Sequence, residues 1–156
     1  MGIEYRLTLA GDIPSEALAA RAMPERADRP AGIPGGPPAL LGAALYESHG
    51  FYLTIVPTDR ASVAAVDDDD ELRMWDIGRN SMVSFDMDKF DSDEDTARAI
   101  VAMLSTVRRV LESGTEDAAL TLNGDWLLLN RIDGVVRRFN RTRWWAHHDV
   151  DDLIEG

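Results

Sequence analysis

Two short turn sequences near the carboxyl end of the chain constrain its fold more than any other feature. Asn-Gly at 123–124 and Asp-Gly at 133–134 each lie between extended apolar segments. The type I′ turns of β-hairpins require a positive φ at both central residues, which Asn, Asp and Gly adopt most readily. The two turns therefore predict a three-stranded antiparallel meander over residues 117–140.

The two-residue loops also set the register of this meander, with Leu120 opposite Leu127 and Leu129 opposite Arg138. Because side chains alternate between the faces of a sheet, the register predicts two sets of residues. The first set is expected to pack on a helix and comprises Ala118, Leu120, Leu122, Leu127, Leu129 and Val136. The second set, also largely apolar, comprises Thr121, Trp126, Leu128, Ile132, Val135 and Phe139. This second set needs cover from the rest of the chain or from a partner.

One long amphipathic helix is predicted over residues 93–113. Ser92 or Asp93 can cap its first turn, and the acidic residues 93–95 place negative charge at the positive end of the helix dipole. Apolar residues at spacings of three and four form one stripe, which predicts the buried face. The stripe comprises Ile100, Met103, Leu104, Val107, Val110 and Leu111.

The other elements follow from period-2 alternation and helix signals. The patterns predict a strand over 3–10, a hairpin over 40–56 and a strand over 79–88. Residues 14–22 predict a short helix, because Pro suits its first turn and Ala, Leu and Glu propagate it. A short helical turn is expected over 61–66.

Two segments are predicted to be loops. Seven of the nine residues 30–38 are Pro or Gly, and the acidic run 67–71 places adjacent carboxylates that repel one another. A length of 156 residues suits one domain, expected to span 1–156. The predicted class is α+β: an antiparallel sheet with the C-terminal meander packed on one long helix, plus a short N-terminal helix.

The negative charge is concentrated in the middle of the chain. Residues 67–95 carry −9 of the net charge of −12. Such a chain is not expected to bind nucleic acid or an anionic membrane, because neutralising phosphates requires a basic face. No apolar run approaches the ~20 residues of a membrane span. Residues 1–10 lack the order of a signal peptide and Cys is absent, so the expected location is cytoplasmic.

One group of acidic residues has a spacing found in calcium sites. Asp91, Asp93 and Asp95 match the first three ligand positions of an EF-hand loop, but Thr96 and Ala102 stand where Gly and Glu are required. Their position before the long helix favours capping instead. We predict no metal site and no cofactor.

Candidate catalytic residues are few. His49 is expected to serve the 46–50 turn, and His147 and His148 are expected in a terminal surface segment beside Trp144 and Trp145. The chain lacks a P-loop, a Gly-x-Gly-x-x-Gly fingerprint, a His-Glu-x-x-His motif and a Gly-x-Ser-x-Gly elbow. The sequence therefore predicts that the protein is not an enzyme.

Residues 131–143 form a local basic stretch, with five Arg against Asp133. Phe139, Trp144 and Trp145 are interleaved with or follow these Arg, as on some nucleic-acid-binding surfaces. The overall negative charge opposes that reading, so we expect the Arg side chains to pair with the acidic centre of the same chain.

From Gly78 onward, and at its amino terminus, the sequence resembles the Sit-type immunity family associated with bacterial swarming inhibition and polymorphic toxins. The resemblance spans residues 1–10 and 78–145, so the 30–38 segment and the Asp67–Asp70 run lie outside it. It is carried by residues 1–10, Ser81–Lys89, Met103–Leu111, Asp117–Asp125, Leu128–Arg131 and a Trp near the end.

The resemblance implies a protein that neutralises a cognate bacterial toxin by non-catalytic binding. If that toxin is a basic nuclease, acidic residues would complement its substrate groove and an aromatic residue would anchor the contact. Trp75 and Trp126 are the aromatic candidates, Trp126 equally fitting a core position. The acidic candidates are Asp67, Asp68, Asp69, Asp70, Glu71, Asp86, Asp88 and Asp91.

Two other functions fit the same sequence. One is a structural or interaction domain that forms a homodimer through the Trp126, Leu128 and Phe139 face of the 117–140 meander. The other is a small hydrolase or ligand-binding enzyme, which would need a pocket with convergent polar groups.

Overall fold

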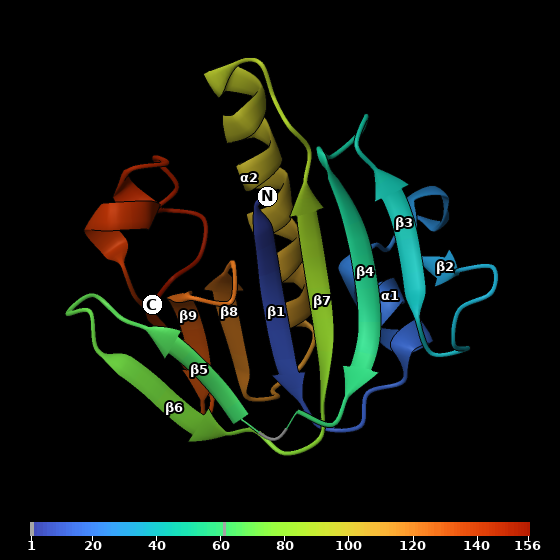
Figure 1. Cartoon of the computed structure of the whole chain (residues 1–156), viewed down its shortest axis with the longest axis horizontal. Helices are drawn as coiled ribbons and strands as arrows, with labels where there is room; N and C mark the ends of the chain where they lie inside the picture. Colours follow the sequence, from blue (N-terminus) through green and yellow to red (C-terminus); the bar gives the residue numbers. More distant parts are fainter. Residues whose placement is uncertain (1, 61) are drawn as a thin grey trace.

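The structure, a computed structural model, describes residues 2–60 and 62–156. Its strands form one mostly antiparallel ten-stranded sheet in the order β2-β3-β4-β7-β1-β8-β9-β5-β6, with β10 paired to β9 (Figure 1). The fold is α+β, as predicted. The strands are β1 (Glu4–Ala10), β2 (Ala31–Gly32), β3 (Leu41–Leu45), β4 (Phe51–Thr58), β5 (Ser62–Val66), β6 (Leu72–Asp76), β7 (Asn80–Met87), β8 (Ala118–Leu122), β9 (Trp126–Ile132) and β10 (Val135–Arg138). The helical segments are α1 (Ser15–Ala22), η1 (Arg26–Asp28), α2 (Asp93–Glu112) and η2 (Arg141–Ala146).

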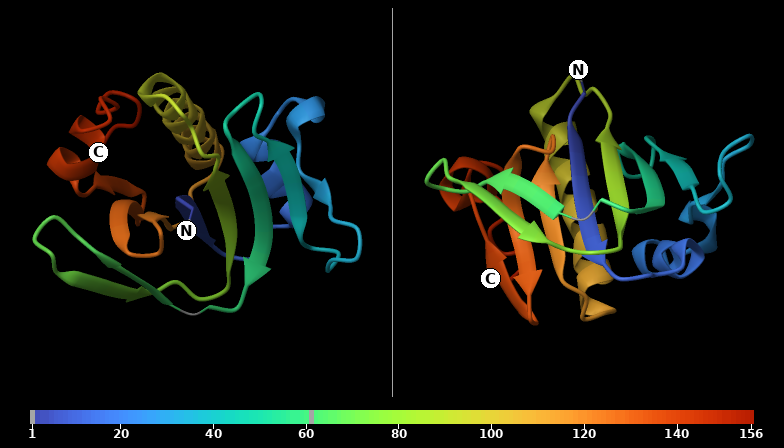
Figure 2. Two further views of the ribbon diagram at one scale, coloured as in Figure 1. Left: turned by 45° about the horizontal axis from the view of Figure 1, so that its top comes forward. Right: turned by 60° about the horizontal axis from the view of Figure 1, so that its bottom comes forward.

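The long helix α2 covers one face of the sheet, and the β5–β6 hairpin crosses the other (Figures 1 and 2). The Ser92 hydroxyl accepts a hydrogen bond from the Asp95 N–H (3.2 Å), which confirms the predicted cap. The whole predicted stripe of α2 is buried against β1, β4, β7, β8 and β9. Local sequence signals therefore determine both the start of this helix and the face that it buries.

The meander has both predicted turns. Asn123 and Gly124 have φ values of 52° and 67°, and Asp133 and Gly134 have 52° and 80°, as type I′ turns require. In the second hairpin Leu129 lies opposite Arg138, which confirms that part of the register.

The predicted register of the first hairpin is wrong. Leu120 lies opposite Leu129 and Thr121 opposite Leu127, so Leu128 is the extra residue of a β-bulge. The bulge turns Leu128 and Leu129 both toward the main core and leaves Leu127 on the opposite face. The Leu128 carbonyl oxygen accepts hydrogen bonds from the Phe139 N–H (2.9 Å) and the Trp145 indole N–H (3.0 Å), contacts that the turn sequence cannot encode.

The helical turn expected over 61–66 is also wrong. Residues 62–66 form β5, which pairs antiparallel with β6 in a hairpin closed by the acidic run, and Ala61 lies outside the described residues. Alternation explains the strand: Val63 and Ala65 face inward, whereas Ala64 is exposed.

This hairpin covers part of the second apolar face of the meander. Ala65, Ala119, Leu127 and Phe139 form a buried cluster, with Val63 and Trp75 packed against it. The chain itself therefore covers the part of this face around Phe139. Of the other predicted members, Trp126 and Leu128 pack in the main core, whereas Ile132 and Val135 remain 41% and 56% exposed.

The surface segment that we predicted at the carboxyl end is only partly correct: His147 is exposed, but the tryptophans before it lie in the core. Trp144 and Trp145 are fully buried, in a T-shaped contact with ring centroids 5.0 Å apart. Trp144 also packs edge-on against His148, whose pKa is lowered by burial and by His147. Two adjacent indoles in one helical segment can both be buried because this segment lies beside α2, on the same side of the meander (Figure 2).

The predicted amino-terminal elements are confirmed. Strand 3–10, helix 14–22, hairpin 40–56 and strand 79–88 correspond to β1, α1, β3–β4 and β7. Within residues 30–38 only Ala31–Gly32 pairs, as the short edge strand β2.

Candidate functional site

The β5–β6 hairpin, residues 62–76, is here named the acidic arm, and it contains most of the predicted binding residues. It lies at one end of the strand order, with β6 as the last strand. A single parallel bridge, Val66 opposite Trp126, connects it to β9. The arm therefore depends on its inward-facing side chains and on its tip for attachment to the rest of the protein.

Asp67 shapes the tip of the acidic arm. Its Oδ1 accepts hydrogen bonds from the N–H groups of Asp69 (3.0 Å) and Glu71 (3.2 Å), and its Oδ2 accepts one from Arg73 Nε (2.5 Å). The Arg73 hydrogen bond, with the two backbone bonds, holds the pKa of Asp67 below its ordinary value despite its burial. Asp68 to Glu71 are exposed as predicted, whereas Asp67 is only 2% exposed.

The tip is fastened to the segment that precedes the buried tryptophans. Asp68 accepts hydrogen bonds from the backbone N–H groups of Asn140 (2.6 Å) and Arg141 (3.3 Å). Asp70 pairs with the guanidinium of Arg143 through contacts of 2.6 and 3.3 Å, which lower the pKa of Asp70. The expected pairing between the basic stretch and the acidic centre is confirmed at Arg143.

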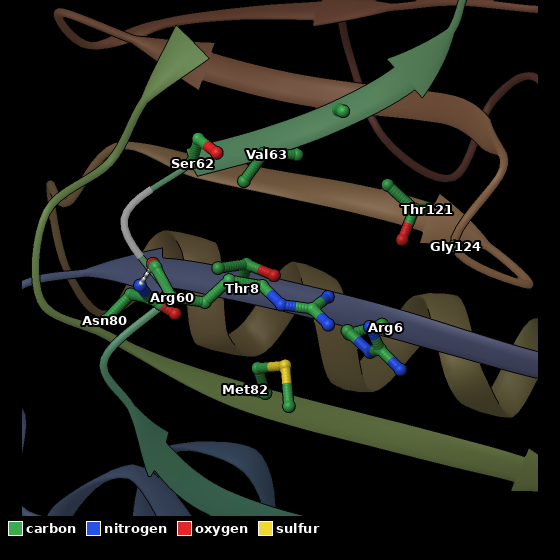
Figure 3. A pocket seen from close by; sticks show the side chains of 10 residues that line it. Arg6, Thr8, Arg60, Ser62, Val63, Asn80, Met82, Thr121 and Gly124 are labelled. Atoms are coloured by element: carbon green, nitrogen blue, oxygen red, sulfur yellow. Dashed lines mark hydrogen bonds between the residues drawn. The ribbon is translucent and has the colours of Figure 1, made fainter. Parts of the chain in front are cut away.

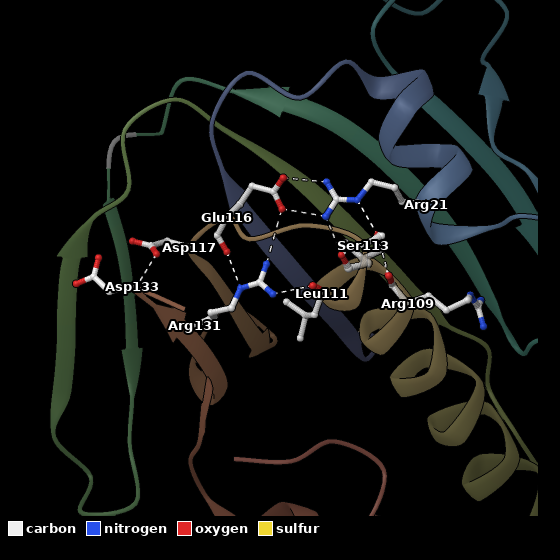
Figure 4. Close-up of polar contacts among 9 residues, drawn as sticks. Arg21, Arg109, Leu111, Ser113, Glu116, Asp117, Arg131 and Asp133 are labelled. Atoms are coloured by element: carbon white, nitrogen blue, oxygen red, sulfur yellow. Dashed lines mark hydrogen bonds and ion pairs between the residues drawn. The ribbon is translucent and has the colours of Figure 1, made fainter. Parts of the chain in front are cut away.

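The Arg residues earlier in the basic stretch have other partners. Arg131 is buried and donates hydrogen bonds to the carbonyl oxygens of Glu116 (2.8 Å) and Leu111 (2.7 Å) (Figure 4). Glu116 also binds Arg21 at 2.9 and 3.0 Å, an interaction that lowers the pKa of Glu116. Arg138 binds the carbonyl oxygen of Asp151 at 2.6 Å. These contacts tie α1, the end of α2 and β9 together.

The two faces of β6 differ in character. Arg73 and Trp75 face inward, and the Arg73 guanidinium lies 5.0 Å from the centre of the Phe139 ring. Leu72 and Met74 face outward and are 62% and 66% exposed. Sequence reasoning missed these two residues, because apolar residues at alternate positions ordinarily indicate the buried face of a strand.

The carboxylates of three acidic residues of the arm make no hydrogen bond of their own with the described residues. Asp69, Glu71 and Asp76 are exposed, and among the described residues none of them forms an ion pair. Together with Leu72 and Met74 they give the exposed surface of the arm two apolar side chains with carboxylates beside them.

Asp86, Asp88 and Asp91 lie elsewhere. They follow one another at the end of β7 and in the connection to α2, and β7 is separated from β6 by β1, β8, β9 and β5 in the sheet. Burial, and then the neighbouring Glu4, raises the pKa of Asp86. The structure thus divides the predicted acidic residues into two separate groups, the arm and the end of β7.

The two aromatic candidates are both half-buried. Trp126 packs against the main core, and Trp75 packs under the arm against the cluster around Phe139. The buried Trp75 indole N–H has no hydrogen-bond partner among the described residues.

A small hollow of about 50 Å³ lies between the arm and the outer face of the sheet (Figure 3). Arg6 and Arg60 line it together with the hydroxyl-bearing Thr8, Ser62 and Thr121. Its volume is well below the ~300 Å³ of typical small-molecule sites. Sequence reasoning did not single out this group, because its members come from four separate segments.

Two further observations concern ligands and membranes. In residues 2–60 and 62–156, no three His, Asp or Glu side chains converge as metal ligands would. None of the helices that the structure describes is long and apolar enough to cross a membrane.

The fold defines the class as an α+β protein, with an acidic and partly apolar hairpin exposed at one end of its sheet. A family model described as SitI3-like matches residues 3–149, and the chain belongs to this family. The match confirms the resemblance found in the sequence and also spans the 30–38 and 67–71 segments, which that resemblance left out. Membership indicates an immunity protein. No curated protein and no solved structure matches the chain.

Proposed function

We propose that this protein is an immunity protein that binds a cognate bacterial toxin and neutralises it by non-catalytic contact, with the acidic arm as the contact surface. The observation that carries the proposal is the exposed surface of the arm in a member of the SitI3-like family. There, Leu72 and Met74 are exposed beside Asp69, Glu71 and Asp76.

The composition of this surface suits tight and selective binding. Burial of exposed apolar side chains against a partner stabilises the complex, because it removes apolar surface from water. Charges around the apolar side chains favour a partner of opposite charge. These charges are negative, so the favoured partner carries a basic surface. A basic nuclease is one class of toxin with that charge, since it must hold phosphates.

The predicted residues take different parts in this proposal. Asp69 and Glu71 attract the toxin, whereas Asp67, Asp68 and Asp70 hold the arm in place through their own partners. Trp75 supports the arm from inside rather than anchoring the toxin. Asp86, Asp88 and Asp91 form a second anionic surface, several strands away from the arm.

The self-association expected through the meander face has less support. Of its three proposed contact residues, Leu128 is fully buried and Phe139 is only 8% exposed under the arm. Trp126 packs against the main core. Moving the arm away would uncover Phe139 but not Leu128, which faces the main core.

The test is a binding titration between the purified protein and the toxin encoded beside its gene, at low and at high salt. A nanomolar Kd that rises with salt is expected, because the arm contributes charge as well as apolar contact. A toxin of a different immunity system serves as the control. Absence of binding, together with failure to rescue growth on co-expression with the toxin, contradicts the proposal.

A further inference from the structure

β6 is an edge strand of unusual accessibility. It is the last strand in the sheet, and β5 is its one partner in the described part of the chain. The other terminal strands of the sheet are β2, which contains only two residues, and β10, which branches from β9. Exposed strand edges pair readily with other chains, and natural proteins usually shorten or cover them.

The hydrogen-bond pattern shows which backbone groups of β6 point away from β5. The Asp67 N–H donates to the Glu71 carbonyl oxygen (3.0 Å), which makes these two residues a hydrogen-bonded pair. Pairs alternate along an antiparallel ladder, so Val66 and Leu72 form a non-hydrogen-bonded pair. In agreement, the Val66 N–H points away from β6 and donates to the Asp125 carbonyl oxygen (2.7 Å).

The same alternation applies along the rest of β6. Arg73 and Trp75 direct their N–H and C=O groups toward β5. Leu72, Met74 and Asp76 direct theirs away from β5, toward the open edge of the sheet. Outside the β5–β6 ladder, no hydrogen bond between described residues engages the backbone groups of these three residues.

We infer that β6 receives an extended segment of the toxin as an additional antiparallel or parallel strand of the sheet. This inference rests on the proposed function and specifies how the arm would bind. Main-chain hydrogen bonds to Leu72, Met74 and Asp76 would supply affinity, as in other cases of β-strand addition. The exposed side chains of Leu72 and Met74 would contact apolar residues at alternate positions of the incoming strand.

Charge identifies the partner as basic and not as a second copy of this chain. Residues 67–76 contain six acidic residues and one Arg, a net charge of −5. Two β6 strands placed edge to edge would bring these charges together, and like charges across a strand pair are destabilising. A toxin segment with Lys or Arg near Glu71 and Asp76 would instead be attracted.

Amide hydrogen exchange measured by NMR gives a direct test at single residues. In the free protein, the Leu72, Met74 and Asp76 amides should exchange faster than those of Arg73 and Trp75. With saturating toxin, exchange at the first three should slow by about tenfold or more, because each amide acquires an acceptor. If the toxin binds and these three amides remain unprotected, strand addition is wrong while the proposed function stands.

A pair of variants at one position tests the main-chain bond separately from the side chain. Met74→Pro removes the N–H that points toward the open edge of the sheet and leaves the hydrogen bonds to β5 in place. Met74→Ala keeps this N–H and removes only the side chain beyond Cβ. Met74→Pro should weaken toxin binding by about tenfold more than Met74→Ala.

Thermal melting of both variants checks that the arm remains folded, and the exchange measurement decides the matter if Met74→Pro melts at a lower temperature. Equal binding by two folded variants overturns the inference. A wild-type protein that does not bind the toxin overturns the proposed function as well.

Discussion

The indole N–H of Trp144 donates a hydrogen bond of 3.1 Å to the hydroxyl oxygen of Tyr5, which lies 139 residues earlier in the chain. The two rings meet edge to face, with their centroids 5.6 Å apart. Both side chains are buried, and burial raises the pKa of Tyr5 to about 12. This contact joins the first strand of the central sheet to the last helical segment.

Tyr5→Phe should therefore destabilise the protein by about 1–3 kcal/mol, because it leaves the buried Trp144 N–H without an acceptor. Urea unfolding followed by tryptophan fluorescence measures the change. Tyr52→Phe is the matched control, since Tyr52 is half-buried and its hydroxyl makes no hydrogen bond with the described residues. Equal stability of the two variants would show that the Tyr5 hydroxyl contributes nothing.

The sequence predicts those parts of the fold that depend on neighbouring residues. Turn chemistry at 123–124 and 133–134, the cap at Ser92 and the apolar stripe of α2 each depend on residues a few positions apart. The bulge at Leu128 and the burial of Trp145 are linked, because the Leu128 carbonyl oxygen accepts a hydrogen bond from the Trp145 indole N–H. No local pattern contains that relationship.

The candidate site shows the same division. The charge run 67–71 marks the tip of the arm, but its attachment through Asp70 and Arg143 joins residues 73 positions apart. Alternation in 62–66 is too short to distinguish a strand from a helical turn, so β5 was not predicted. Without β5, the sequence gives no reason to expect an exposed edge at Leu72 and Met74.

Gly50 in the β3–β4 turn should not tolerate a side chain. Its φ is +88°, and an added Cβ would lie 2.6 Å from the Cβ of Ala99 on α2. Gly124 is the control, because a side chain there meets only the backbone strain of a positive φ (+67°) and no steric clash. Nothing lies within 4 Å of the added atom. We expect Gly124→Ala to cost about 1 kcal/mol and Gly50→Ala about 3 kcal/mol. Chemical denaturation measures both, and equal losses would mean that the turn can move away from α2.

The buried carboxylate at the tip of the arm should make stability depend on pH. The pKa of Asp67 is lowered in the folded protein, chiefly by Arg73, so its contribution is present above the unfolded value near 4. The contribution is lost as the pH falls through the lowered folded value.

Asp67→Asn should therefore lower the melting temperature at pH 7, because the amide keeps the shape but not the charge that faces Arg73. The difference from the wild type should narrow below about pH 4. Asp69→Asn, an exposed neighbour without an ion pair among the described residues, is the control and should change little. A difference in melting temperature between Asp67→Asn and the wild type that stays constant down to pH 2 would mean that the charge of Asp67 is not what stabilises the arm.

The two anionic groups can be compared directly by removing three charges from each. The triple variant Asp69→Asn, Glu71→Gln, Asp76→Asn neutralises three carboxylates of the arm, and Asp86→Asn, Asp88→Asn, Asp91→Asn neutralises the end of β7. If the arm meets a basic toxin, the first variant should slow association by about tenfold at low salt, because charges at an interface act mainly on the rate of encounter. The second variant should slow it by less than about twofold, since its charges lie several strands away.

Stopped-flow association at low and high salt measures both rates, and the difference between the variants should shrink as salt screens the charges. The opposite order, with the β7 variant slower, would place the toxin at the amino-terminal end of α2 and leave the arm without its proposed part in binding.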